Sequence, residues 1–220
     1  IEQGIVRDLR WPRIEIQACT DSKGNDILVL VGAEPDHRWK AFSASVVDLA
    51  LELGVRAVHG LGAYPAPAPH TRDARVVSTA STPELAEVIG TSAGHIEVPG
   101  GVTASIERMA AERGIPAAGI WAQVPHYAAG MPYPAAALAL LESLLPVAGL
   151  HIDSVALREE AQTTRARLDA LISANPEHES MLHQLEAQSD AEPPPDDPAF
   201  YMSGEEIAAE LEQFLREEGS

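Results

Sequence analysis

The chain has 220 residues, 45% of them apolar, which is enough for one sizeable α/β domain with a buried core. Its formal net charge of −18 disfavours nucleic acid as a partner, because an acidic surface repels the phosphate backbone. The longest apolar run, residues 135–150, is interrupted by Glu142 and Pro146 and is shorter than the ~20 residues of a membrane span, so we expect a soluble protein.

The single cysteine, Cys19, excludes an internal disulfide and is typical of a reducing compartment, so we expect a cytoplasmic protein. Cys19 lies in an extended run and is interpreted as a small buried apolar residue. The sequence begins at Ile1 rather than at a methionine, which predicts that an N-terminal segment precedes it.

The first third of the chain alternates extended and helical patterns. Residues 4–9 and 12–20 resemble two extended segments, and a turn is expected over residues 21–25. The continuous apolar run 27–31 is typical of a parallel strand covered on both faces. Apolar residues at helical spacing then predict a helix over residues 39–53, which Gly54 ends.

The alternation continues through the middle of the chain. Strands are expected at residues 55–61, 76–79, 95–98 and 117–123, and helices at 82–89, 103–113 and 134–145. The proline-rich stretch from Gly62 to Arg72 is too rigid and too poor in N–H donors for the interior of an element, so it is interpreted as a loop. This pattern predicts an α/β fold of three layers, with a mainly parallel sheet between helices.

The last third is more acidic than the rest. Residues 1–150 carry 11 basic and 16 acidic groups (net −5), whereas residues 151–220 carry 4 and 17 (net −13). We therefore divide the chain into an α/β domain (1–150), an acidic helical extension (151–189), a flexible linker (190–202) and a C-terminal amphipathic helix (203–220). The apolar stripe of that last helix could pack on its own domain or on a partner.

Three loops leave the carboxyl ends of predicted strands, at residues 32–38, 62–72 and 124–134. Ligands of open parallel sheets bind at this edge. The loops carry the residues that we select as a candidate ligand-binding or anion-binding site: Glu34, Arg38, His70, Arg72, His126 and Tyr127. Two guanidinium groups could hold a carboxylate or phosphate, and a histidine could transfer a proton.

The same residues also have structural interpretations. Arg38 could pair with Glu34 or Asp36 at the first turn of a helix, and His70 could bind carbonyl groups that the neighbouring prolines leave free. Both interpretations stay open for each residue.

Motifs of established chemistry fail on context. Residues 90–94 spell the G-x-S-x-G nucleophile elbow, but Ser92 follows a helix instead of a strand. Residues 60–65, "GLGAYP", begin like a dinucleotide loop, but Pro65 stands where that loop needs its third glycine. We assign no catalytic residue, no metal site and no cofactor.

Three segments in this order, "GAEPDHRWKAF" (32–42), "PHTR" (69–72) and "WAQVPHY" (121–127), resemble the proteasome assembly chaperone 2 family of actinobacteria. The resemblance implies a three-layer α/β/α fold similar to that of purine nucleoside phosphorylases, and a homo-oligomer. It also implies that the opening strands of the family lie before Ile1. The name of the family implies a role in proteasome assembly.

We therefore favour a cytoplasmic, oligomeric and non-enzymatic binding or assembly protein, with a trimer as the expected oligomer. A protein partner could bind through the acidic C-terminal helices, and neither nucleic acid nor a membrane is expected as a partner. The alternative is an enzyme that acts on a small anionic substrate or nucleoside. In that case Arg38 and Arg72 would bind the anion, and His70 or His126 would act as acid and base.

Overall fold

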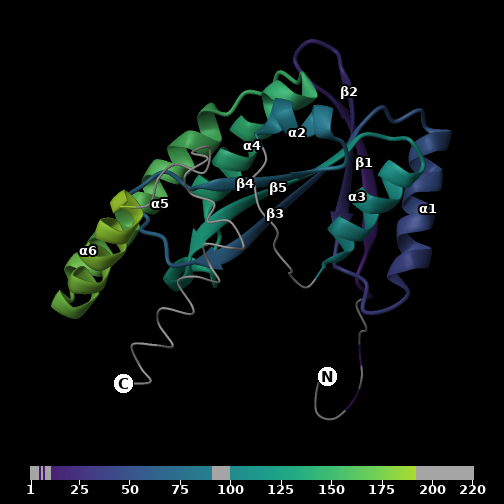
Figure 1. The fold of residues 1–220 in the computed structure, drawn as a ribbon. Helices are drawn as coiled ribbons and strands as arrows, with labels where there is room; N and C mark the ends of the chain where they lie inside the picture. Colours follow the sequence, from purple (N-terminus) through teal and green to yellow (C-terminus); the bar gives the residue numbers. More distant parts are fainter. Residues whose placement is uncertain (1–4, 6, 8–10, 91–99, 192–220) are drawn as a thin grey trace, which may run out of the picture.

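A computed structural model describes residues 5, 7, 11–90 and 100–191 (Figure 1). Its strands are β1 (Ile14–Thr20), β2 (Asp26–Gly32), β3 (Val58–Ala66), β4 (Val76–Ala80) and β5 (Ala117–Pro125). Its helices are α1 (Trp39–Glu52), α2 (Pro83–Ile89), α3 (Val102–Glu112), the short 3-10 helix η1 (His126–Ala128), α4 (Pro134–Ala148), α5 (Val155–Ser173) and α6 (Pro176–Ala191). The strand expected at 95–98, the residues of the linker from 192 on and the last helix lie outside the described residues.

Among the residues that the structure describes, the central sheet has three strands in the order β3-β5-β4. β5 runs parallel to β3 and antiparallel to β4, so the sheet is mixed instead of mainly parallel as expected. Helices cover both faces of β5. Ala117 packs with Ile106 of α3, whereas Ala122 and Val124 pack with Ala136 of α4. Because alternate residues of a strand point to opposite faces, these two clusters form two cores, one on either side of the sheet.

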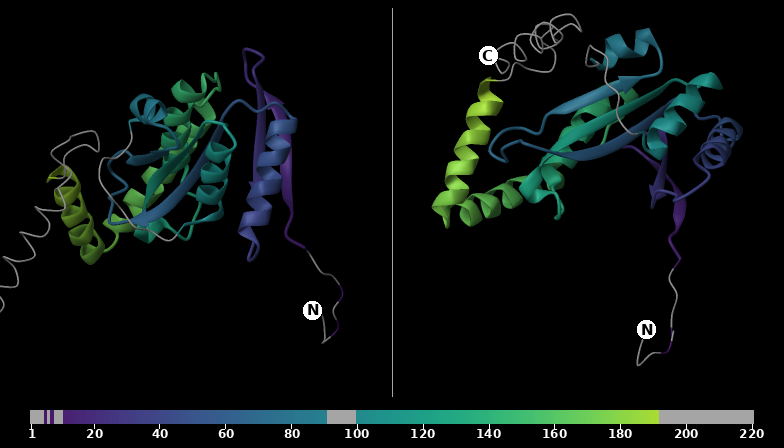
Figure 2. Two further views of the ribbon diagram at one scale, coloured as in Figure 1. Left: turned by 45° about the vertical axis from the view of Figure 1, so that its right-hand side comes forward. Right: turned by 60° about the horizontal axis from the view of Figure 1, so that its bottom comes forward.

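β1 and β2 form a separate antiparallel hairpin rather than part of the central sheet. The expectation of a parallel strand at residues 27–31, covered on both faces, is therefore wrong. The apolar run correctly indicated an extended segment, but the short turn before it joins antiparallel strands. Cys19, expected to be buried, is exposed on β1. Figure 2 shows the hairpin beside α1 and α3, apart from the central sheet.

Local signals explain several boundaries. The Thr82 hydroxyl accepts a hydrogen bond from the Leu85 N–H (3.2 Å) at the start of α2, and Gly90 ends that helix with a left-handed φ of 69°. Pro65 lies inside β3, contrary to the expectation that residues 62–72 form only a loop. In the described part of the chain β3 is an edge strand of the sheet, where a proline without an N–H is tolerated.

The C-terminal helices pack on the α/β domain. α5 lies along α4, and Leu168 of α5 belongs to the same buried cluster as Ala122 and Val124 of β5. α6 makes a sharp turn from α5 and runs past the loop that joins β3 and β4 (Figure 2), where Arg72 binds Asp190 near the end of α6. Within the described ranges, every helix is too short or too polar to cross a bilayer.

Candidate functional site

The loops that follow β3 and β5 meet because these strands are parallel and in register, with Ala66 opposite Pro125. His70 lies at this meeting point and is 2% exposed. The Tyr127 hydroxyl accepts the His70 backbone N–H (2.8 Å) and lies 2.8 Å from the ring Nδ1. On the other side, His70 Nε2 lies 3.0 Å from Asp169 Oδ1 of α5. The imidazole therefore links the sheet edge to α5.

The hydrogen bonds of both His70 ring nitrogens can be assigned together. If the Tyr127 hydroxyl donates to Nδ1, Nε2 carries the proton and donates to Asp169. Burial raises the pKa of the Tyr127 hydroxyl, which keeps it protonated and able to donate. His126 is exposed, and its ring meets that of Tyr127 edge to face with a centroid distance of 5.3 Å. The buried imidazole of His70, with both ring nitrogens hydrogen-bonded, therefore stabilises the loop.

Arg72 is bound to carboxylates of α6. Its Nε and one terminal nitrogen donate to both oxygens of Asp190 at 2.8 Å, and the other terminal nitrogen lies 3.3 Å from Glu186. The bidentate hydrogen bonds with Asp190 raise the pKa of the guanidinium and lower that of the Asp190 carboxyl. The Thr71 hydroxyl donates to Glu186 and is the main cause of the lowered pKa of that carboxyl.

Further arginines add contacts to the same loop. Arg165 of α5 donates to the Thr71 carbonyl (2.8 Å), and Arg75 donates to the Ser189 carbonyl of α6 (2.6 Å). The segment "PHTR" is thus the attachment point for both C-terminal helices. The acidic residues of α6 occupy the positions that an anionic ligand of Arg72 would take.

Glu34 and Arg38 lie in a different part of the molecule. Glu34 Oε1 accepts the Val102 N–H at the start of α3, and Arg38 adopts a left-handed φ of 62° directly before α1. The indole N–H of Trp39 donates to the Pro35 carbonyl and closes this loop. The described contacts link neither Glu34 nor Arg38 to the His70 group. The structure therefore brings together His70, Arg72, His126 and Tyr127, and separates the other two candidates from them.

The reason for this division is the sheet topology. The six residues were expected together because β2, β3 and β5 would end at one edge of one parallel sheet. β2 belongs to the hairpin instead, so its carboxyl end carries Glu34 and Arg38 to the starts of α3 and α1.

A mainly apolar hollow of about 320 Å³ lies at the carboxyl ends of β3 and β5. Its walls include Tyr64, Val124, Met131, Tyr133 and Leu140. Burial, and secondarily the neighbouring Tyr127, raises the pKa of Tyr133 to about 12. The hollow has no charged lining residue, so it suits apolar or aromatic side chains better than anions.

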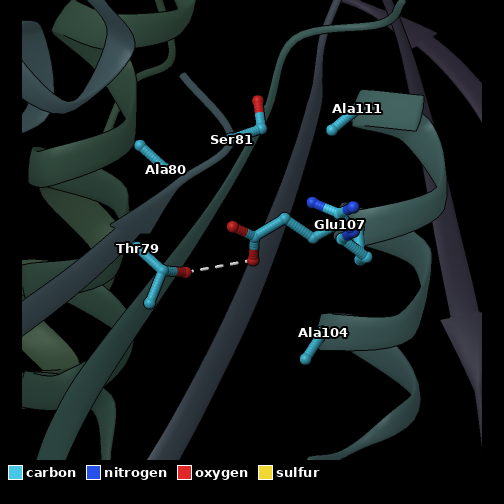
Figure 3. Close-up of a pocket in the computed structure, with 7 residues that line it drawn as sticks. Thr79, Ala80, Ser81, Ala104, Glu107 and Ala111 are labelled. Atoms are coloured by element: carbon cyan, nitrogen blue, oxygen red, sulfur yellow. Dashed lines mark hydrogen bonds between the residues drawn. The ribbon is translucent and has the colours of Figure 1, made fainter. Parts of the chain in front are cut away.

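A second hollow, of about 270 Å³, lies between β4 and α3 (Figure 3). The Thr79 hydroxyl donates to the Glu107 carboxylate across it (3.0 Å), and burial raises the pKa of that carboxyl. Gly119 makes room for this pair, since a Cβ there would lie 2.7 Å from the Thr79 hydroxyl oxygen and 2.9 Å from Glu107 Oε2. Sequence reasoning missed Glu107. A glycine within a buried strand was the available signal of a close approach.

No group of three or more potential metal ligands occurs among the described residues. The arrangement at the sheet edge consists of ion pairs and hydrogen bonds that join the chain to itself.

Several known proteins are similar to this chain. A model described as the PAC2 family matches residues 1–172. The structure of a Mycobacterium tuberculosis protein of unknown function is similar with a TM-score of 0.77 and 36% identity, over 82% of this chain and 63% of that one. A proteasome-assembly chaperone homologue of M. tuberculosis gives 0.73 and 29%, over 82% and 77%. A PAC2 family protein from Streptomyces avermitilis gives 0.71 and 32%, over 83% and 76%.

The chain thus spans less than two thirds of the first of these relatives. Among curated proteins, no sequence matches it.

Proposed function

Because the chain belongs to the PAC2 family, we propose that it is a non-enzymatic binding or assembly protein that acts as a homo-oligomer in the cytoplasm. The M. tuberculosis relative described as a proteasome-assembly chaperone homologue suggests subunits of a proteasome as its partner. The likeness in fold does not by itself imply this role, so the proposal also depends on the candidate site.

The observation that carries the proposal is that the charged groups at the sheet edge are already paired. Arg72 makes a bidentate contact with Asp190 and approaches Glu186, and His70 lies between Tyr127 and Asp169. An anionic substrate would have to displace two carboxylates of the same chain. A protein that binds other proteins needs no free cation or proton-transfer group at this edge.

The exposed carboxylates of the C-terminal helices are the surface that we propose for the partner. Glu159, Glu160, Glu177 and Glu179 are all exposed on α5 and α6. Such a surface would attract a basic patch and accelerate association at low ionic strength.

The test uses the M. tuberculosis proteasome α and β subunits as purified probes. We expect this chain to bind one of them or an early assembly intermediate, as measured by native gel electrophoresis and light scattering. A variant with Glu159→Gln and Glu160→Gln should bind more weakly and with less salt dependence, while a control with Glu112→Gln on α3 should bind like the wild type. Absence of binding to both subunits at low and physiological salt would contradict the proposal.

Point variants are preferable to removal of the C-terminal helices. A chain cut before Ser154 would lose Leu168 from the core cluster and expose Val124. Its failure to bind would report unfolding as readily as loss of the docking surface.

The enzyme alternative has its own measurement. Phosphate, nucleosides and nucleotides would be screened for stabilisation against heat. A ligand at about 100 times its dissociation constant adds roughly 2.7 kcal/mol to the free energy of unfolding. Stabilisation that disappears in Arg72→Ala but persists in Arg108→Ala would favour a small anionic substrate.

A further inference from the structure

The apolar hollow at the carboxyl ends of β3 and β5 opens directly onto the core of the domain. Val124 and Ala136, which are 8% and 3% exposed, line it and also belong to the buried cluster on the α4 side of the sheet. Met131, Tyr133 and Leu140 pack against the same cluster and form further parts of the lining. The hollow is therefore an opening in the described part of the core, where apolar side chains can be reached from outside.

The size and the chemistry of this hollow suit aromatic side chains. An apolar cavity of about 150 Å³ holds one benzene ring, and this hollow measures about 320 Å³. Its lining includes the rings of Tyr64 and Tyr133 and the thioether of Met131. These groups form edge-to-face and sulfur–aromatic contacts with an inserted ring. The hollow can therefore hold one or two bulky apolar side chains of a peptide segment.

The chain itself supplies such side chains shortly after the end of α6. Phe200, Tyr201 and Met202 are consecutive, and Phe200 is the first aromatic residue that follows α6 in the sequence. The apolar residues between Ile207 and Leu215 are spaced for one face of a helix and would need a groove about 12 Å long. A group of three neighbouring residues matches a compact hollow better than that longer stripe does.

The end of α6 is held close to the hollow. Arg75 donates to the Ser189 carbonyl at 2.6 Å, so the last turn of α6 lies against the loop that joins β3 and β4 (Figure 2). The hollow lies at the carboxyl end of β3, and the outer strands of a three-stranded sheet are only about 10 Å apart. The nine residue steps from Ala191 to Phe200 span up to about 30 Å. The segment is therefore long enough to reach the hollow of its own chain.

The charges near the hollow favour the same path. Asp196 and Asp197 precede Phe200 by four and three residues. Burial raises the pKa of Tyr133, and the nearby charge of Arg165 opposes that rise, which places the exposed guanidinium of α5 close to the hollow. A path that brings the acidic pair past Arg165 gains electrostatic attraction within an otherwise acidic protein.

The second hollow, between β4 and α3, does not suit this segment. Its lining includes the carboxylate of Glu107 and the guanidinium of Arg108. An aromatic ring inserted there would remove water from charged groups without giving them a partner, which costs free energy. The choice between the two hollows therefore follows from their linings.

We infer that residues 200–202, the Phe-Tyr-Met segment, bind back onto their own domain and fill the apolar hollow between β3, β5 and α4. The inference goes beyond the proposed function, because the segment would occupy the hollow whether or not the chain binds proteasome subunits. It also implies that a partner with an aromatic side chain for this hollow must compete with the chain's own C-terminal segment.

Cross-linking within one chain provides the direct test. In a Cys19→Ser background, Ala137→Cys and Ala199→Cys place one thiol at the hollow and one beside Phe200. Ala137 is exposed and lines the hollow, so its replacement leaves the core intact. The matched control has the same two cysteines with Phe200→Ser and Tyr201→Ser added, which keeps the length of the tether and removes the aromatic rings. We expect mild oxidation to form the intramolecular disulfide at least about tenfold faster without the serine substitutions.

Two outcomes of this experiment would overturn the inference. Equal rates in the test protein and the control would show that the aromatic rings do not bind at the hollow. A disulfide that joins two chains, even at low protein concentration, would assign the segment to the hollow of a second copy.

Oxidation of methionine by hydrogen peroxide provides a second test without introduced cysteines. Met131 lines the hollow, whereas Met181 lies on α6 and serves as the internal reference. Phe200→Ser with Tyr201→Ser should raise the rate of Met131 oxidation at least about threefold relative to Met181, because the segment no longer shields the thioether. Mass spectrometry of peptides measures both rates. An unaltered ratio would contradict the inference, and this ratio decides if the cysteine variants fail to fold.

Discussion

The carboxyl edge of the central sheet and the β1–β2 hairpin each differ from what their sequences suggest. The sequence predicts free charged groups at the edge and a buried strand in the hairpin, and the structure shows the reverse. The sheet edge carries Arg72 and His70 and resembles a ligand site, but its charges are paired within the chain. The hairpin has the sequence of a buried strand, but Leu28 and Val31 are exposed. The polar side chains at the sheet edge bind the C-terminal helices of the same chain, whereas the apolar side chains of the hairpin are exposed. The following experiments test that contrast, from the largest expected effect to the smallest.

The first experiment tests whether α5 is part of the domain core. Leu168→Ala should lower the free energy of unfolding by about 2–5 kcal/mol, because Leu168 is only 4% exposed and its removal leaves a cavity. Leu171→Ala on the same helix should cost less than about 0.5 kcal/mol, since Leu171 is 60% exposed. Urea denaturation measures both. A loss of unfolding free energy in Leu168→Ala as small as that expected for Leu171→Ala would show that α5 does not contribute to the core.

The second experiment tests the internal role of His70. His70→Phe should lower the free energy of unfolding by about 1–3 kcal/mol, because Tyr127 and Asp169 lose their partner. His126→Phe is the control, since His126 is exposed, and should change stability by about 0.5 kcal/mol or less. Thermal and urea unfolding are the measurements. A stable His70→Phe protein would favour a functional role for the imidazole.

The third experiment tests whether Arg72 holds α6. Arg72→Ala should leave the global stability nearly unchanged, since exposed ion pairs contribute little, but should increase amide hydrogen exchange within α6. High salt should have the same effect on the wild type. Arg108→Ala, which removes a surface ion pair with Glu112 on α3, should leave exchange in α6 unaltered. Unchanged exchange in Arg72→Ala would mean that the apolar contacts of α6 suffice.

The fourth experiment tests the carboxyl group in the second hollow. Burial raises the pKa of Glu107 in the folded protein above its ordinary value of 4.5. The folded state then binds the proton more tightly than the unfolded chain, so this group makes stability fall as pH rises from about 4.5 through the raised pKa. Glu107→Gln should remove that part of the pH dependence, as followed by urea unfolding between pH 4 and 7. An unaltered slope would show that the carboxyl is well solvated.

How far each feature could be predicted depended on how local its cause is. The bounds of α1 followed from apolar spacing at Phe42, Val46 and Leu49, and the end of α2 from Gly90, because these signals act within one or two turns. The meeting of His70 with Tyr127 was also predictable, since two parallel strands end at the same edge.

The rest depended on partners far along the chain. Nothing near Arg72 indicates that Asp190, 118 residues later, occupies its guanidinium. The direction of β2 and its separation from the central sheet were equally hidden, because an apolar run reports what a strand can bury and not which strand lies beside it.

The sequence by itself determined the α/β class, most of the helices and strands, and membership of the family through three short motifs. Only the tertiary structure decided that the charged motif residues hold the C-terminal helices and that the apolar strand of the hairpin stays open. The physical reason is that secondary structure follows from neighbours in the chain, whereas ion pairing and strand pairing depend on which distant groups the fold brings within a few ångströms.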